Sequence, residues 1–263
     1  MPLKAISLYT GAGGLDLGLE SAGFETRVAV ELDGVCVRTL RANRDWPVIE
    51  RSIHEAPSSE LLETARLEFG EADLLFGGPP CQPFSKAGYW ASGDSRRLDD
   101  PRADTVAAYL RVLRDSRPRA FLMENVAGLA FRGKDEGLRL IQRTLESINK
   151  ASGTHYRASL LVLNAADFGV PQIRQRAFLI GARDGRLFGD VVPTHRPLTS
   201  KDQSELDLLG DLSPYLSAWD AIGDLEDDDS RDLLVRGKWA DLLPSIPEGK
   251  NSYHYPQLSP MLR

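Results

Sequence analysis

The stretch KAISLYTGAGGL, residues 4–15, decides the fold of this chain of 263 residues. It begins as a continuous apolar run and passes through a glycine-rich turn into a segment with helical spacing, Leu15–Ala22. A continuous apolar run is typical of a strand that is buried on both faces of a sheet. Strand, glycine turn and helix in this order predict an α/β protein, although many α/β proteins need glycine at this turn for geometry alone.

The same alternation continues to about Ala182. Strand-like runs occupy Lys4–Tyr9, Thr26–Glu31, Asp73–Gly77, Ala120–Asn125, Ala158–Asn164 and Ala177–Ala182. Helical spacing occupies Leu15–Ala22, Val35–Asn43, Ser59–Phe69, Thr105–Asp115 and Leu138–Lys150. This alternation predicts a doubly wound, mostly parallel sheet. A loop and no clear helix separates the last two strands, so we expect an antiparallel last strand.

The pattern decays after Ala182, where prolines become frequent and an acidic stretch surrounds Asp227. We therefore expect one domain over residues 1–185 and an irregular acidic extension over residues 186–263. Within the extension, the spacing allows short helices at Ser217–Ile222 and Lys238–Leu243.

The composition excludes several classes of protein. A content of 42% hydrophobic and 27% charged residues suits a globular α/β domain with an appendage. No apolar run approaches the length of a membrane span, and the N-terminus lacks a signal-peptide pattern, so we expect no membrane contact. The two cysteines, Cys36 and Cys81, imply no disulfide framework, which fits a reducing cytoplasm. Cys36 lies between valines and is expected to be a small buried hydrophobe, and we expect no metal site.

An acidic residue follows the glycine turn at a spacing that is typical of nucleoside-binding folds. The second predicted strand ends at Glu31, roughly 20 residues on, where a carboxylate can bind ribose hydroxyls at the carboxyl edge of the sheet. The turn lacks the phosphate-binding spacing of a dinucleotide fold. A nucleoside without pyrophosphate, such as S-adenosylmethionine, therefore fits better, and an exposed strand-end charge is the alternative for Glu31.

A second motif, GGPPCQPFS over residues 77–85, directly follows the apolar run Leu74–Phe76. Its prolines fix φ and remove backbone donors, so the turn cannot continue the sheet or wind into a helix. The turn thus presents Cys81 at the mouth of the sheet. A buried thiol in a proline loop is the alternative, but proline on both sides of a cysteine fills a core poorly and fixes a nucleophile well.

Two further segments carry polar side chains. Glu124 ends the apolar strand of the segment MENV, residues 123–126, where it would act as a hydrogen-bond donor or general acid braced by Asn125, or else as a helix-capping acid. Arg174 and Arg176 are two residues apart in an extended segment and so point to the same side. They would clamp a phosphate or a base carbonyl, or else be solvated surface arginines.

In this order and spacing, the four pieces resemble the DNA (cytosine-5)-methyltransferase family, and the similarity runs from Lys4 to about Arg183. The segments GPPCQPFS and MENV are the family's most specific motifs, and residues 172–176 match its Gln-x-Arg-x-Arg element. The resemblance implies a sheet of the S-adenosylmethionine-dependent methyltransferase type. Residues 1–185 would then be the catalytic, cofactor-binding domain.

The resemblance also implies roles for individual residues. Cys81 would be the nucleophile, Glu124 with Asn125 would contact the target cytosine, and Arg174 and Arg176 would hold the flipped nucleotide. Residues 85–102 match the loop that closes over DNA in this family. The cofactor site would be lined by Tyr9, Gly11, Ala12, Gly13, Gly14, Leu15, Glu31, Leu32, Ser52, Ile53 and Pro80.

Two departures from the family pattern stand out. The family usually has an acidic residue before a branched apolar one after the third strand, and this chain has Ser52-Ile53, so the adenine contact is weakened or supplied otherwise. The family's target-recognition domain and its Gly-Asn-x-Val element are not found after residues 241–249. A net charge of −6 also suits a stand-alone DNA binder poorly.

We therefore expect a second polypeptide that carries the basic, DNA-reading part, with a shortened gene product as the alternative. The implied reaction transfers a methyl group from S-adenosylmethionine to carbon 5 of cytosine in double-stranded DNA through a covalent cysteine adduct, as in a restriction-modification system. A tRNA cytosine-5 methyltransferase, or an inactive regulatory fragment, is the alternative.

Overall fold

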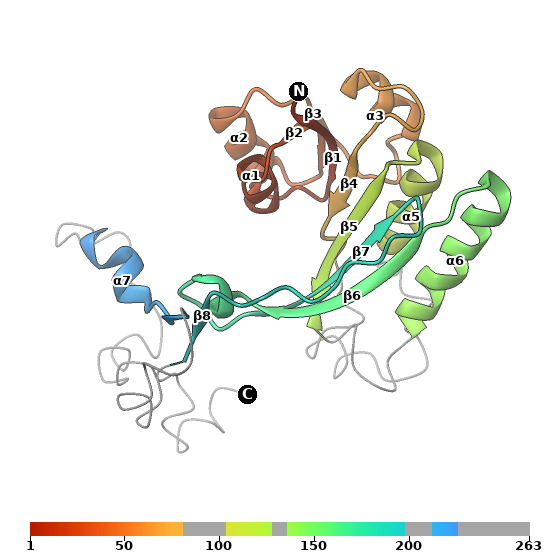
Figure 1. Ribbon diagram of the computed structural model, residues 1–263. Coiled ribbons are helices and arrows are strands. Elements are labelled where there is room, and N and C mark those ends of the chain that lie inside the picture. Colours follow the sequence, from red (N-terminus) through yellow and green to blue (C-terminus); the bar gives the residue numbers. More distant parts are fainter. Residues whose placement is uncertain (81–103, 128–135, 198–211, 226–263) are drawn as a thin grey trace, which may run out of the picture. The chain divides into compact units, whose positions relative to one another are not determined.

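The computed structural model describes residues 1–80, 104–127, 136–197 and 212–225 (Figure 1). The chain divides into two compact units, Met1–Ser217 and Ala218–Arg263. Among the described residues, the second unit holds helix α7 (Ala218–Ile222) and the 3-10 turn η4 (Gly223–Leu225). The expected boundary after residue 185 stays a prediction, and the predicted helix over residues 238–243 lies outside the described residues.

The first unit alternates strands and helices as predicted. Its large sheet contains β1 (Leu3–Leu8), β2 (Phe24–Glu31), β3 (Val48–Glu50), β4 (Leu74–Gly77), β5 (Ala120–Val126), β6 (Arg157–Asn164) and β7 (Gln175–Ala182). The remaining elements are α1 (Gly14–Ser21), α2 (Gly34–Asn43), α3 (Ser58–Ala65), α5 (Asp104–Ser116), α6 (Glu136–Ser152), the 3-10 helix η3 (Ala165–Phe168), and a small sheet of β8 (His195–Arg196) and β9 (Ser213–Pro214). Helix α3 ends earlier than predicted, because Arg66 adopts a left-handed conformation with φ of 53°. None of the helices that the structure describes has the length and apolar character to cross a membrane.

The strand order of the seven-stranded sheet is β3-β2-β1-β4-β5-β7-β6. Strands β1 to β5 pair in parallel, whereas β7 lies antiparallel to both β5 and β6, which confirms the predicted antiparallel last strand. The short η3 connection after β6 explains this pairing, since a parallel crossover needs a dozen or more residues. The order reverses at β1, and α/β proteins bind ligands at the carboxyl ends of strands beside such a reversal.

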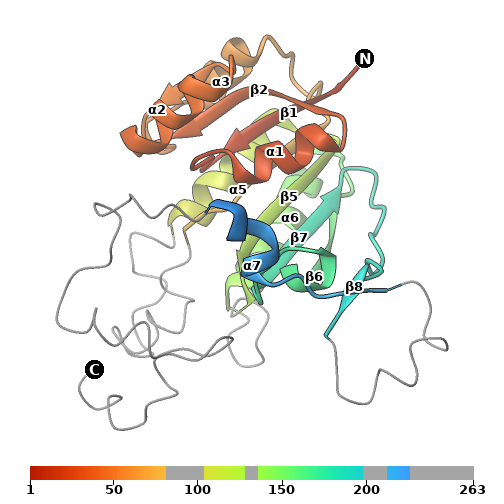
Figure 2. The ribbon, with the colours of Figure 1, turned by 90° about the vertical axis from the view of Figure 1, so that its left-hand side faces the viewer.

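Helices cover both faces of the sheet (Figures 1 and 2). Helices α3, α5 and α6 bury the larger apolar cluster on one face, and the other face packs Phe76 of β4 against Leu15 and Leu19 of α1. Tyr109 of α5 is fully buried, and its hydroxyl lies 3.0 Å from the carbonyl oxygens of Leu75 and Leu122. Burial raises the pKa of this hydroxyl well above its usual value, so Tyr109 remains a donor that joins α5 to β4 and β5.

The register of the sheet decides which side chains meet at its carboxyl edge. Leu8 of β1 pairs with Gly77 of β4, and Gly77 pairs with Met123 of β5. The residues that follow, Gly78 among them, therefore emerge side by side. Gly77 must be glycine, because a Cβ there would lie 2.1 Å from the carbonyl oxygen of Leu8.

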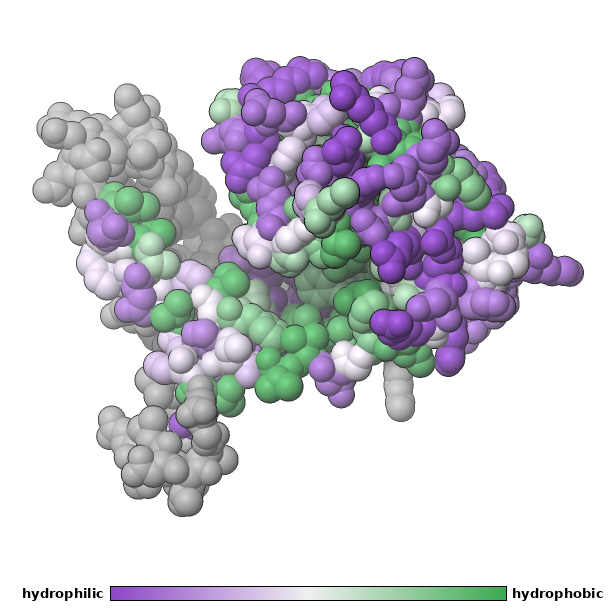
Figure 3. All heavy atoms as spheres, turned by 45° about the horizontal axis from the view of Figure 1, so that its top comes forward, coloured by the Kyte–Doolittle hydropathy of each residue, from purple (hydrophilic) through white to green (hydrophobic). Residues whose placement is uncertain are grey.

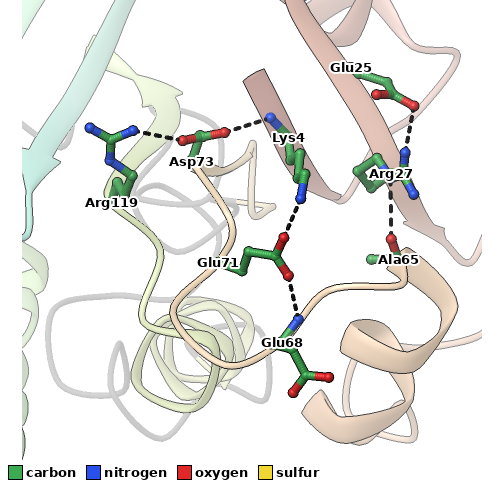
Figure 4. A network of polar contacts seen from close by, with 8 residues as sticks. All are labelled: Lys4, Glu25, Arg27, Ala65, Glu68, Glu71, Asp73 and Arg119. Atoms are coloured by element: carbon green, nitrogen blue, oxygen red, sulfur yellow. Dashed lines mark hydrogen bonds and ion pairs between the residues drawn. The ribbon is translucent and has the colours of Figure 1, made fainter. Parts of the chain in front are cut away.

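At the opposite, amino edge, charged side chains are paired with one another (Figure 4). Lys4 forms an ion pair with Glu71, and its backbone N–H donates to Asp73 Oδ2 at 2.8 Å. Asp73 Oδ1 accepts from Arg119 at 3.1 Å. Next to this group, Arg27 contacts Glu25. These contacts tie together the beginnings of β1, β4 and β5.

Candidate active site

A cavity of about 480 Å³ opens at the carboxyl edge of the sheet, within the range of about 300–1,000 Å³ usual for small-molecule sites. The first strand, its turn and α1 contribute Ser7, Leu8, Tyr9, Thr10, Gly14, Leu15 and Asp16. Strands β4, β5 and β7 with their connections contribute Phe76, Gly77, Gly78, Glu124, Ala165, Arg174, Arg176 and Phe178. Figure 3 shows a largely hydrophilic surface in which hydrophobic residues gather where it is hollowed. The described parts of all four predicted motifs thus converge on one cavity.

Glu124 and Arg176 form an ion pair inside the cavity. Arg176 Nε lies 2.9 Å from Glu124 Oε1, and the two side chains are 24% and 29% exposed. Their strands place them there, because antiparallel pairing sets Arg176 opposite Val126 and Glu124 opposite Phe178. The two side chains are therefore diagonal neighbours on one face of the sheet. The sequence predicted both residues as site residues but not their contact with each other.

The second arginine is held differently. The backbone N–H of Arg174 donates to Asn164 Oδ1 at 3.0 Å, which fixes the chain before β7. Its guanidinium lines the cavity and makes no ion pair within the described parts of the chain. Both arginines thus line the same cavity, and their predicted action as a clamp stays a prediction. Among the described residues, the Arg174 guanidinium has no hydrogen-bond partner, so its donors are available to a ligand.

Asn125 and Thr105 hold the proline turn that leads to Cys81. Asn125 is buried and donates from Nδ2 to the carbonyl oxygen of Pro79 at 3.3 Å. Thr105, at the start of α5, donates to the carbonyl oxygen of Pro80 at 3.2 Å, and Tyr9 donates to the carbonyl oxygen of Thr105 at 2.7 Å. Cys81 and residues 85–102 lie outside the described residues, so the nucleophile remains a prediction. Its turn is described as far as Pro80.

Gly78 leaves the space that Glu124 needs. A Cβ at Gly78 would lie 3.0 Å from Glu124 Oε2. Any larger residue at this position would push against the carboxylate oxygen that does not bind Arg176. The glycine pair before the prolines therefore serves two purposes: Gly77 lets β1 and β4 approach, and Gly78 makes room for the acid.

Glu31 fastens the glycine turn to the end of β2. Its Oε2 accepts from the backbone N–H of Gly11 at 2.7 Å, and its Oε1 accepts from Leu32 and Asp33 at 2.8 Å each. The turn itself needs glycine, because Gly11 and Gly13 have φ of 58° and 88°. The carboxylate of Glu31 thus shapes the turn, and its predicted contact with a ribose stays a prediction.

The predicted cofactor residues fall into two groups. Tyr9, Gly14 and Leu15 line the cavity. The remainder are not among its lining residues: Gly11, Ala12, Gly13, Glu31, Leu32, Ser52, Ile53 and Pro80.

Ser52 and Ile53 form the turn after β3. Ser52 Oγ accepts from His54 N at 3.3 Å, and the carbonyl oxygen of Ile53 accepts from Arg111 at 2.6 Å. Ile53 is only 4% exposed, so its side chain belongs to the core. A contact of this pair with adenine stays a prediction.

Asp16 is a cavity residue that the sequence reasoning missed. It lies in the first turn of α1 and is 1% exposed. Burial raises its pKa from the usual 3.8 to about 6, against the opposing effect of hydrogen bonds from Ser7 and Thr26. An acid in the first turn of a helix ordinarily stabilises the helix dipole, so its position in the sequence carried no separate signal.

Comparison with known proteins shows what the chain is similar to. The family model described as C-5 cytosine-specific DNA methylase matches residues 3–243. The Type II methyltransferase M.AquIA of Picosynechococcus sp. is 45% identical over 229 residues, which are 86% of this chain and 90% of that protein. The Type II methyltransferase M.SacI of Streptomyces achromogenes is 36% identical over 95% of this chain. The match covers 65% of M.SacI, slightly less than two thirds of its length.

Solved structures share the architecture. A putative DNA modification methyltransferase encoded within an Escherichia coli prophage superposes with a TM-score of 0.61 at 25% identity, covering 98% of this chain and 69% of that one. The methyltransferase EhMeth of Entamoeba histolytica has a TM-score of 0.55 at 18% identity over 76% of this chain and 58% of its own, a likeness of fold alone.

Proposed function

Because the chain belongs to the C-5 cytosine-specific DNA methylase family, we propose that it transfers a methyl group from S-adenosylmethionine to carbon 5 of cytosine in DNA. The observation that carries this proposal is the convergence of the glycine turn, Glu124, Arg174 and Arg176 on one cavity. The relatives M.AquIA and M.SacI are Type II methyltransferases. The proposed role is therefore the modification half of a restriction-modification system.

The cavity suits S-adenosylmethionine, a nucleoside joined to an amino acid, better than a dinucleotide. Gly14 and Leu15 open α1 at the cavity wall, and no side chain caps the start of this helix. Tyr9, Gly14, Leu15 and Asp16 would hold the cofactor, which supplies a methyl group on a positively charged sulfur. Glu31 would contribute by holding the turn in shape.

The chemistry requires a nucleophile, because carbon 5 of cytosine is too weak a nucleophile to attack the methyl group on a positively charged sulfur directly. In the proposed mechanism, the Cys81 thiolate adds to carbon 6 and its electron pair forms the new carbon–sulfur bond. The ring electrons move onto carbon 5, which would take the methyl group as the methyl–sulfur bond of the cofactor breaks, with the bonding pair remaining on the sulfur of the departing S-adenosylhomocysteine. Transfer of the proton on carbon 5 to a base, such as a water molecule, then restores the ring double bond and expels the Cys81 thiolate.

Glu124 and the arginines would stabilise the ring during this sequence. Glu124 would give a proton to ring nitrogen 3 as the thiolate adds, and Arg176 would hold the carboxyl group in place. Arg174 would bind a phosphate or the base carbonyl. These groups line a cavity at the sheet edge, which a stacked base cannot enter, so the cytosine must be flipped out of the duplex.

The direct test is methyl transfer by the full chain from tritiated S-adenosylmethionine to DNA, with the product base identified by nucleoside analysis. We expect 5-methylcytosine. Methylation of tRNA but not DNA would favour the RNA alternative, and 4-methylcytosine or 6-methyladenine would contradict the proposed chemistry.

We further propose that target recognition requires a basic polypeptide in addition to these 263 residues. The net charge of −6 supports this, because DNA affinity rests largely on phosphate neutralisation. The test compares DNA binding and turnover by the chain alone with those after addition of the candidate partner across a salt series. Full sequence-specific turnover by the chain alone would contradict it.

The expected cytoplasmic location likewise stays a prediction.

A further inference from the structure

The segment that carries Arg174 is held by hydrogen bonds more than by packing. Gln172, Ile173 and Arg174 are exposed, and Ile173 is 81% exposed, so burial of apolar surface does little to fix the chain before β7. Both backbone polar groups of Arg174 are bonded to the end of β6 instead. Its N–H donates to Asn164 Oδ1 at 3.0 Å, and its carbonyl oxygen accepts from the N–H of Ala165 at 2.9 Å. The place of Arg174 at the cavity therefore depends on how the Asn164 side chain is oriented.

The Asn164 side chain is itself oriented by two partners. Its Nδ2 lies 3.2 Å from Asp167 Oδ1 and 3.4 Å from the Tyr215 hydroxyl oxygen, and the Tyr215 hydroxyl donates to the same Asp167 oxygen. A carboxylate only accepts, so the amide must turn Nδ2 toward Asp167 and leave Oδ1 for the N–H of Arg174. The hydrogen bond to Asp167 also raises the pKa of Tyr215, so the hydroxyl remains a donor at neutral pH.

Tyr215 belongs to a part of the chain that is distant in sequence, the small sheet of β8 and β9. Its backbone N–H donates to the carbonyl oxygen of Arg196 in β8 at 2.9 Å. Just before β8, the N–H of Thr194 donates to the carbonyl oxygen of Asp167 in η3 at 2.9 Å. The small sheet is therefore anchored on η3 by both backbone and side-chain hydrogen bonds. Through Asp167 and the amide beside it, the small sheet is connected to the segment before β7.

We propose that Asn164 is a positioning residue for Arg174, and that Tyr215 together with Asp167 holds Asn164 in its working orientation. The assignment rests on the proposed function, in which Arg174 binds the DNA substrate. A guanidinium recognises a phosphate or a base carbonyl only in a narrow range of geometries, so a shift of its backbone weakens the contact. The small sheet thus acts on substrate binding from outside the cavity, since neither Asn164 nor Tyr215 is among the lining residues.

The test measures methyl transfer by Asn164→Ala at varied DNA concentration, using the full chain, with its partner polypeptide where transfer requires one. Loss of the hydrogen bond predicts about 3–10-fold lower kcat/KM for DNA, with the affinity for S-adenosylhomocysteine unchanged in calorimetry. Asn149→Ala is the matched control. Asn149 also accepts from a backbone N–H, that of Tyr156 at 2.8 Å, but it is not among the cavity residues. This variant should lose stability and keep its kcat/KM.

A second comparison separates the positioning of Arg174 from a general structural role. In an Arg174→Ala background, Asn164→Ala should cause no further loss of kcat/KM, because the guanidinium that it positions is absent. Equal fold-losses in the two backgrounds would overturn the assignment. An unchanged kcat/KM in Asn164→Ala alone would also overturn it.

Tyr215→Phe removes one half-buried hydroxyl and so tests the orientation of Asn164 with little disturbance of the fold. It should lower kcat/KM for DNA about 2–5-fold in the wild-type background, and should add nothing in the Asn164→Ala background. No loss in the wild-type background would overturn the role of Tyr215. If Asn164→Ala does not fold, Tyr215→Phe with and without Arg174→Ala decides the question in the same way. Absence of methyl transfer by the wild-type protein would instead refute the proposed function, which is a different result.

Discussion

The two ends of the same parallel strands are built in opposite ways. At the amino edge, Lys4, Glu71, Asp73 and Arg119 satisfy one another in a chain of exposed and partly buried contacts. At the carboxyl edge, Asp16 keeps a buried oxygen without a partner. Both edges are rich in charge, so the difference lies in whether the charges are paired.

The contrast shows which charges serve the fold and which are kept for a ligand. Exposed ion pairs add little stability, because water already solvates both partners and salt screens them. An unpaired charged side chain in a cavity lowers the stability of the fold, so its presence there indicates a role in binding or catalysis. Glu124 and Arg176 lie between these extremes, since they are paired with each other yet remain partly exposed inside the cavity.

The largest expected effect concerns the nucleophile at the carboxyl edge. Cys81→Ala and Cys81→Ser should each abolish methyl transfer, because neither side chain provides a thiolate at neutral pH. Tritiated transfer and trapping on 5-fluorocytosine DNA measure this. Cys36→Ser is the control, since Cys36 lies on α2, is not among the residues that line the cavity, and should retain activity. Near-normal turnover by either Cys81 variant would sink the assignment.

Glu124→Gln should lower kcat about 10²–10⁴-fold, the usual range for loss of a general acid. Glutamine keeps an acceptor for Arg176 but cannot release a proton. Single-turnover methyl transfer measures the effect. Asp73→Asn, a carboxylate change at the amino edge, should leave kcat unchanged. A comparable loss in both variants would erase the proposed distinction between the edges.

Strand β2 carries an acid at each end and so offers a direct comparison. Glu31→Ala should weaken cofactor binding by about 1–3 kcal/mol, because it removes three charge-assisted hydrogen bonds that shape the turn and any contact with the ribose. Glu25→Ala, at the amino end of the strand, should have no effect on this affinity. Calorimetry with S-adenosylhomocysteine measures both. Unchanged affinity in a folded Glu31→Ala protein would defeat the placement of the cofactor.

Asp16 should make the ligand-free protein less stable as pH rises. Its folded pKa of about 6 exceeds the usual 3.8, so the folded state binds more protons between these values and the free energy of unfolding falls across that window. Asp16→Asn should therefore be more stable than wild type by about 1–3 kcal/mol at pH 8 and much less so at pH 4. Urea unfolding at the two pH values measures this. Destabilisation at pH 8 would indicate a purely structural role.

The smallest effect is expected at the amino edge, where the change of stability with pH has the opposite sign to that caused by Asp16. The hydrogen bond from Lys4 holds the pKa of Glu71 below its usual value, so its contribution is present at neutral pH and is lost on acidification. Glu71→Gln should shift the melting temperature only slightly, and less so at high salt. A loss of cofactor affinity in this variant would contradict the separation of the two edges.

Local sequence patterns predicted much of this architecture. The apolar runs and glycine turns anticipated the strands, the helices and the antiparallel β7, because these depend on residues close together in the chain. Glu124, Arg174 and Arg176 were predicted as site residues from patterns of the same local kind, and all three line the cavity, while their roles stay predictions. Strand β3 was not among the predicted strands, because its three residues are too short for a periodic signal.

By itself, the sequence determined the sheet type, the edge at which the motifs gather and the family. The tertiary structure alone decided that Arg176 pairs with Glu124, since this follows from the register of β5 against β7, two strands separated by some fifty residues. It also decided that Asp16 is a cavity residue and that Glu31 holds Gly11. Burial and hydrogen-bond partners come from packing between distant segments, and no local pattern contains them.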